Sequence, residues 1–88
     1  MQKYAYDKVI VSNPQGSEFG IKERLNKSNN PLLLIEALEN PSITIELVKF
    51  IYDRLQFLSI MGYATPAVAE TISAMIEDKI DEFYTRGR

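Results

Sequence analysis

The sequence contains no cysteine, no histidine and no tryptophan among its 88 residues. Without cysteine the fold cannot be held by disulfides, so a small core or a partner must stabilise it. Without histidine and cysteine there are no Ser-His or Cys-His nucleophile pairs, no usual zinc ligands and no common general base near neutral pH. Carboxylates that hold a hard cation such as Mg²⁺ are the main chemistry left. We therefore expect that the protein is not an enzyme and that it binds no metal and no cofactor.

A strong charge of one sign and a long hydrophobic run are also absent. Ten Lys and Arg against 12 Asp and Glu give a net charge of −2, which is not typical of a bulk nucleic-acid binder. The longest aliphatic run, Leu32–Ile35, is far shorter than the ~20 residues of a membrane span. Asp7 and Lys8 stand where a signal peptide would need an apolar stretch. We expect a single domain over residues 1–88, no membrane contact and a cytoplasmic location.

Proline and glycine divide the chain into segments. Asn13-Pro14-Gln15-Gly16 has the residue pattern of a turn. Three other prolines follow an N-cap residue and suit the first helical position, at Asn30-Pro31, Asn40-Pro41 and Thr65-Pro66. Gly62 and Gly87 stand where a left-handed residue would end a helix. These signals predict three helices, at about 31–39, 41–61 and 66–86.

The first thirty residues have a different period. Phe19, Ile21 and Leu25 share a strand face and not a helical face, and Lys3–Val11 is rich in residues that favour strands. With the turn at Asn13–Gly16 between them, the two segments predict a β-hairpin, and an extended arm is the open alternative. The predicted fold class is therefore α+β, with a hairpin or arm over 1–29 and a three-helix unit over 30–88. A lone hairpin is marginal in water, so it must pack on the helices or on another chain.

The central predicted helix carries the clearest sign of a binding surface. On a helical wheel its apolar arc spans about 180°, whereas a typical surface helix has a stripe of about 100°. Either neighbouring helices cover the whole arc, or its Phe50 and Phe57 edge is exposed in the monomer and buried in an oligomer. Arg54 lies inside the arc, and we expect it to be half buried and paired with an acidic group. The predicted partner or oligomer interface consists of Ile43, Phe50, Arg54, Phe57 and Met61.

The N-terminal segment is more basic than the rest of the chain. Residues 1–30 hold five basic and three acidic groups, whereas residues 31–88 hold five and nine. Basic residues interleaved with aromatic ones are how proteins hold single-stranded nucleic acid. The predicted contacts of this segment are Tyr4, Tyr6, Lys8, Lys22 and Arg24.

Two acidic pairs, Glu36-x-x-Glu39 and Asp78-x-x-Asp81, resemble the paired acidic motifs of all-helical nucleotide pyrophosphatases. The resemblance implies a Mg²⁺ site that holds a phosphate, although no basic phosphate clamp accompanies it. We expect instead a non-enzymatic protein-interaction module that assembles with itself and with another protein, as an adaptor, inhibitor or structural component. A small nucleic-acid-binding regulator is the first alternative, and a Mg²⁺-dependent pyrophosphatase is the second.

Overall fold

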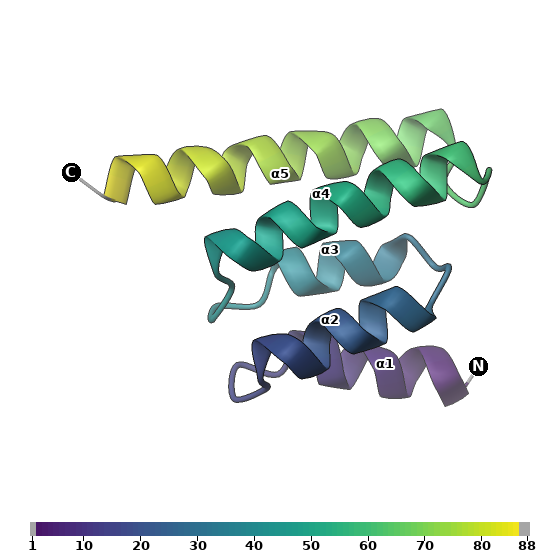
Figure 1. Ribbon diagram of the computed structural model, residues 1–88, viewed down its shortest axis with the longest axis horizontal. Coiled ribbons are helices and arrows are strands. Elements are labelled where there is room, and N and C mark those ends of the chain that lie inside the picture. The colour runs from purple at the N-terminus through teal and green to yellow at the C-terminus, as the bar shows by residue number, and fades with distance from the viewer. Residues whose placement is uncertain (1, 87–88) are drawn as a thin grey trace.

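A computed structural model describes the backbone of residues 2–86 and the side chains of residues 4–85. This part of the chain contains α-helices and no strand (Figure 1). The helices are α1 (Gln2–Ser12), α2 (Glu18–Lys27), α3 (Leu32–Leu38), α4 (Ile45–Ile60) and α5 (Pro66–Arg86). Within the described residues, no helix has both the length and the apolar character needed to cross a bilayer.

The helices alternate between two layers. Odd-numbered helices form one layer, in which α3 contacts both α1 and α5, and α2 contacts α4 in the other layer. In Figure 1, α2 and α4 lie nearer the viewer and α1 and α3 lie behind them. The body is flat, with extents of 41 × 30 × 16 Å. Helix pairs stacked side by side in this way also build α-solenoids, although this sequence shows no internal repeat.

The prediction of an N-terminal hairpin or extended arm, and with it the α+β class, is wrong because both segments are helices. In α2, the Ser17 side chain accepts a hydrogen bond from the backbone N–H of Gly20 and so caps the helix. Ile21 and Leu25 are four residues apart and both are buried. Phe19, which completed the strand pattern, is 75% exposed. The spacing of the buried pair is therefore helical, and Phe19 belongs to the surface.

Helix α1 shows no clear hydrophobic periodicity, because a charged residue lies on its buried face and apolar residues lie on its exposed face. Its inner face includes Asp7 and Val11, which are spaced as on one helical face and are both buried. The Asp7 carboxylate is 3.3 Å from the Arg24 guanidinium of α2, which compensates the buried charge. Tyr6 and Val9 are 58% and 65% exposed. Hydrophobic periodicity alone could not reveal this helix.

Three of the proline and glycine signals are correct, and the signal predicted at Gly87 lies outside the described residues. The turn at Asn13–Gly16 is present and connects two helices, with the Gly16 N–H donating to the Asn13 carbonyl at 2.9 Å. Helix α5 begins at Pro66, as predicted. Gly62 has a φ of +82°, and the N–H of Tyr63 donates to the Leu58 carbonyl at 2.8 Å. This is the Schellman arrangement that ends a helix at a left-handed glycine.

The start of α4 was predicted four residues too early, at Pro41. Thr44 is the true N-cap, since its hydroxyl accepts from the Leu47 N–H at 3.1 Å. Asn40 is fully buried and serves another purpose. Its amide nitrogen donates to the carbonyls of Val11 and Asn13, at 3.0 Å each. The side chain therefore fastens the end of α1 to the loop between α3 and α4.

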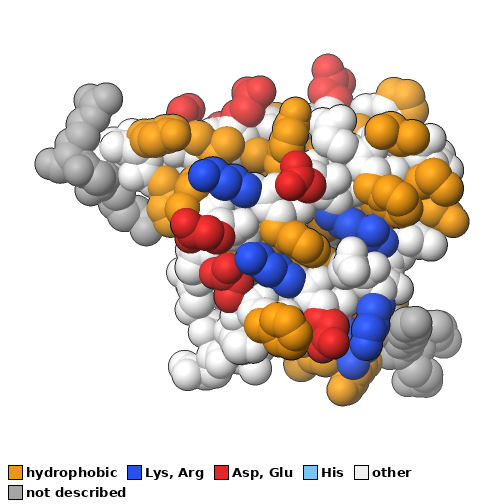
Figure 2. All heavy atoms as spheres, viewed as in Figure 1, with side chains coloured by type: hydrophobic (Ala, Val, Ile, Leu, Met, Phe, Trp, Pro, Cys, Tyr) orange, Lys and Arg blue, Asp and Glu red, His pale blue; other side chains and the backbone are white. Residues whose placement is uncertain are grey.

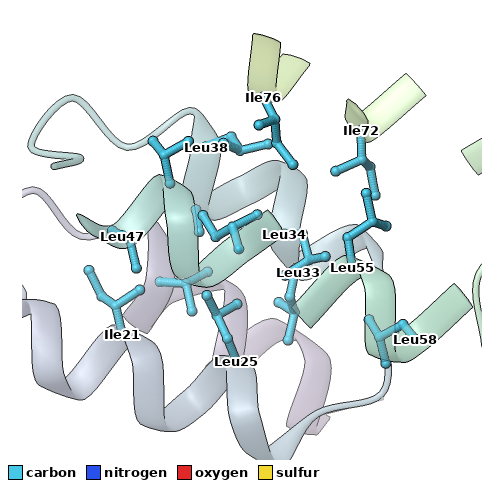
Figure 3. Close-up of a cluster of buried hydrophobic side chains, with 14 of the residues drawn as sticks. Ile21, Leu25, Leu33, Leu34, Leu38, Leu47, Leu55, Leu58, Ile72 and Ile76 are labelled. Carbon is cyan, nitrogen blue, oxygen red and sulfur yellow. The ribbon is translucent and has the colours of Figure 1, made fainter. Parts of the chain in front are cut away.

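The core lies where the two layers meet, with α3 at its centre. Four of the seven residues of α3 are buried, and this helix contacts every other helix. Figure 3 shows the side chains of α2, α4 and α5 converging with those of α3. The labelled members of this cluster are Ile21, Leu25, Leu33, Leu34, Leu38, Leu47, Leu55, Leu58, Ile72 and Ile76. Residues before and after position 30 thus share one core.

We expect Asn40→Ala to lower the free energy of unfolding by about 1–3 kcal/mol, because it leaves two carbonyls of a buried contact without a donor. Urea unfolding followed by circular dichroism would measure the loss. Gln56→Ala, at an exposed position of α4, is the control and should be neutral or slightly stabilising. Equal effects of the two substitutions would contradict the role assigned to Asn40.

Candidate interaction surface

Two shallow hollows lie side by side between α2 and α4. Phe19, Lys22, Glu23, Asn26 and Phe50 line the first. Asn26, Phe50, Asp53, Arg54 and Phe57 line the second. Because Asn26 and Phe50 belong to both, the hollows form one continuous surface, which we call the α2–α4 face. Figure 2 shows hydrophobic and charged side chains interspersed over these two helices.

The position of α2 against α4 is fixed at two points. At the start of α2, the Thr44 hydroxyl donates to the Glu18 carboxylate at 2.5 Å. At its end, Nη2 of Arg54 donates to the Ser28 carbonyl at 2.9 Å and to Oδ1 of Asn29 at 3.2 Å. Ser28 is the C-cap residue of α2, where a cation also complements the helix dipole. The two contacts hold the helices side by side and so define the floor of the face.

Two aromatic rings of the face each have a cation beside them. Nζ of Lys22 lies 5.8 Å from the centroid of the Phe50 ring, and so joins α2 to α4. The Arg54 guanidinium carbon lies 4.7 Å from the centroid of the Phe57 ring. Such cation–π contacts hold the rings in place at the surface. The face is therefore built from oriented side chains.

Arg54 is partly buried, as expected, but it is not paired with an acidic group. Its partners are the carbonyl and the amide oxygen at the end of α2, and it takes part in no ion pair among the described residues. Its Nε is buried without a hydrogen-bond partner. Burial lowers the pKa of the guanidinium. The structural role of Arg54 is therefore to cap α2 and to stack on Phe57.

Apolar residues gather where α4 turns into α5, next to the second hollow. The exposed fractions are 43% for Phe57, 81% for Ile60 and 55% for Met61. Tyr63, in the turn, is 48% exposed. Figure 2 shows hydrophobic side chains clustered at this end of the molecule. The exposed apolar surface thus continues from the α2–α4 face to the tip of the α4–α5 hairpin.

The predicted interface residues are only partly brought together. Phe50, Arg54 and Phe57 lie on the α2–α4 face. Met61 is the C-cap residue of α4, one turn beyond Phe57. Ile43 is partly buried before α4 and packs against the core.

The predicted contacts of the N-terminal segment separate to different sides. Only Lys22 reaches the α2–α4 face. Tyr4 lies on α1 and lines a separate hollow near the end of α2, and Tyr6 lies under the Arg24 guanidinium, which is 5.1 Å from its ring centroid. Lys8 is 3.7 Å from the Glu36 carboxylate of α3.

The basic residues of α1 and α2 whose side chains are described all have acidic partners within the chain. The pairs are Lys8–Glu36, Lys22–Glu18, Arg24–Asp7 and Lys27–Glu23. A phosphate backbone would have to displace these carboxylates before it could bind. This arrangement disfavours the nucleic-acid alternative.

Sequence reasoning missed Phe19, Glu23, Asn26 and Asp53 as members of the face. The first three fall in the segment predicted to be a hairpin or arm, so their position beside α4 could not be seen. A helical wheel for residues 18–27 would have placed Phe19 opposite Ile21 and Leu25, since these two positions are 200° and 240° further around the wheel. The residue pattern therefore indicates that Phe19 is exposed, but only once residues 18–27 are known to form a helix.

The two acidic motifs do not form a metal site in the described part of the chain. No group of three or more carboxylates there is placed to hold a metal ion. Glu36 instead pairs with Lys8. The arrangement gives the pyrophosphatase alternative no geometric support.

Comparison of this chain with models of protein families, with curated proteins and with solved structures finds no match.

We expect Arg54→Met to lower the free energy of unfolding by about 1–3 kcal/mol, because it removes a charged hydrogen bond from the end of α2. Chemical denaturation would measure the change. The matched control is Lys49→Met, which removes an exposed cation from the same helix and should change stability by less than about 0.5 kcal/mol. If the two substitutions have the same effect, Arg54 does not anchor α2.

The Glu18–Thr44 contact predicts a small pH dependence. The hydrogen bond from Thr44, followed by the contact with Lys22, lowers the pKa of Glu18 below its usual 4.5. A lowered pKa in the folded state stabilises the protein above the usual pKa, and this stabilisation is lost as the pH falls through the folded-state pKa. Because the Glu18 side chain is still partly open to solvent, its contribution should be under ~1 kcal/mol.

Unfolding free energies measured at pH 7 and pH 3 test this. Glu18→Gln should show a smaller drop between the two pH values than the wild type. Glu70→Gln, which removes a carboxylate from the exposed side of α5, is the control and should keep the wild-type drop. Identical drops in all three proteins would show that the contact is not formed in solution.

Proposed function

We propose that this chain is a non-enzymatic protein-interaction module that associates with itself, and that the α2–α4 face is its docking surface. The observation that carries the proposal is the exposure of large apolar side chains on and beside this face. Phe19 is 75% exposed and Phe57 43%, with Ile60 and Met61 beyond them. Aromatic residues and Met are enriched in protein interfaces relative to the rest of a protein surface.

The geometry of the face also supports docking of a protein. It is open and shallow, and its polar groups border apolar rings, as in the rim and core of an interface. The Phe50 and Phe57 rings are held by Lys22 and Arg54, so these two residues would lose little side-chain entropy on docking. The proposal keeps the cytoplasm as its setting, where a chain without cysteine needs no oxidising compartment.

We expect Phe50→Asp combined with Phe57→Asp to yield a helical protein of lower mass than the wild type, because burying two carboxylates at an interface is unfavourable. Light scattering would give the mass, and circular dichroism would check folding. Phe57→Asp alone serves as the second variant, since Phe50 packs partly against the core. It should weaken association without unfolding the chain.

The control carries the same charges at two exposed apolar positions away from the face. Val9→Asp combined with Tyr84→Asp places them on α1 and α5, where the native side chains are 65% and 70% exposed. This variant should keep the wild-type mass. A wild type that is already monomeric at micromolar concentration would refute self-association.

A further inference from the structure

We infer that two copies of the chain dock through their α2–α4 faces about a two-fold axis that passes near Asn26 and Phe50. In this arrangement the Phe19 ring of each copy enters the second hollow of the other. The inference rests on the proposed function and specifies the symmetry and the contacts of the self-association. Three features of the described residues support it: the shape of the face, its charges and its size.

The face carries an exposed ring and a hollow on opposite sides of its centre. Phe19 borders the first hollow and is 75% exposed. The second hollow, bordered by Arg54 and Phe57, has a volume of about 340 Å³. Asn26 and Phe50 line both hollows and thus lie between them. A half-turn about this centre exchanges the two sides, so each Phe19 would face the hollow of the other copy. An isologous interface requires this self-complementarity.

The charges of the face also suit an identical partner. Lys22 and Arg54 are balanced by Glu23 and Asp53 within the two hollows. A two-fold interface sets a surface against itself, so a face of one sign would repel its copy. The exposed side of α5 shows the contrast, because among its described side chains, residues 66–85, the carboxylates far outnumber the single cation, Lys79. Its acidic residues are Glu70, Glu77, Asp78, Asp81 and Glu82.

The molecule is large enough for such an interface. A stable pair of standard size buries about 800 Å² on each partner, which is roughly one-seventh of the total accessible surface of 5683 Å². The body is only 16 Å thick, so most of its surface lies on its two broad sides. The α2–α4 face occupies one of them (Figure 2).

The first test is the affinity of self-association. Phe19→Ser should raise the dissociation constant by about tenfold or more, because it removes the ring that fills the partner's hollow. The matched control is Tyr84→Ser, which removes an aromatic ring that is 70% exposed on α5. It should leave the dissociation constant unchanged. Sedimentation equilibrium of both variants and of the wild type would give the values.

The second test uses the absence of cysteine. A single cysteine at Asn26→Cys would lie next to its own copy across the axis, within the Cα–Cα distance of roughly 4.4–6.8 Å that a disulfide requires. Under a glutathione redox buffer this variant should form a disulfide-linked dimer efficiently. Ala74→Cys, at an exposed position of α5, is the control and should remain mostly monomeric on a non-reducing gel.

The outcomes separate the two proposals. A dimer that is weakened by Phe19→Ser and linked through Asn26→Cys supports the two-fold arrangement. If the wild type associates but Asn26→Cys links no better than Ala74→Cys, the two-fold arrangement is wrong while self-association stands. A monomeric wild type at micromolar concentration overturns both, even if another protein is found to occupy the face.

Discussion

The packing of α3 is the constraint on which the rest of the structure depends. This helix has only seven residues, and four of them are buried. Leu33, Leu34 and Leu38 are almost completely removed from water, so α3 must be enclosed from several sides. Within residues 2–86, the other four helices all contact α3, and the two-layer arrangement is the result. The position of α2, and therefore the candidate interaction surface, follows from the need to cover one side of this short apolar helix.

The sequence reveals the second half of the chain better than the first. Thr65-Pro66 and Gly62 define helix ends through local backbone geometry, so their roles can be recognised without the tertiary structure. Asp7 and Asn40 act differently, because both are buried polar residues whose partners lie on other helices. Asp7 interrupts the apolar face of α1, and Asn40 resembles a helix cap. Long-range pairing of this kind overrides the local pattern.

The candidate site shows the same division. Phe50, Arg54 and Phe57 stand out on a wheel because they follow the apolar edge of one helix. Phe19 and Asn26 join them only once α2 is known to be a helix that lies beside α4. Arg54 belongs to both groups. Its position in the apolar arc of α4 is visible on the wheel, whereas its role in capping α2 appears only in the structure. The same residue thus supports the fold and borders the surface proposed for docking.

The order of contacts along the stack has a consequence for folding kinetics. Within the described residues, each helix contacts only the next helix or the next but one in the sequence. Contacts between segments that are near in sequence need little loop closure, so chains of this type reach the folded state quickly. A seven-residue helix is too short to persist by itself in water, so α3 gains its structure only as its neighbours assemble around it. We therefore expect rapid folding in which α3, the most buried helix, becomes helical only when its neighbours pack around it.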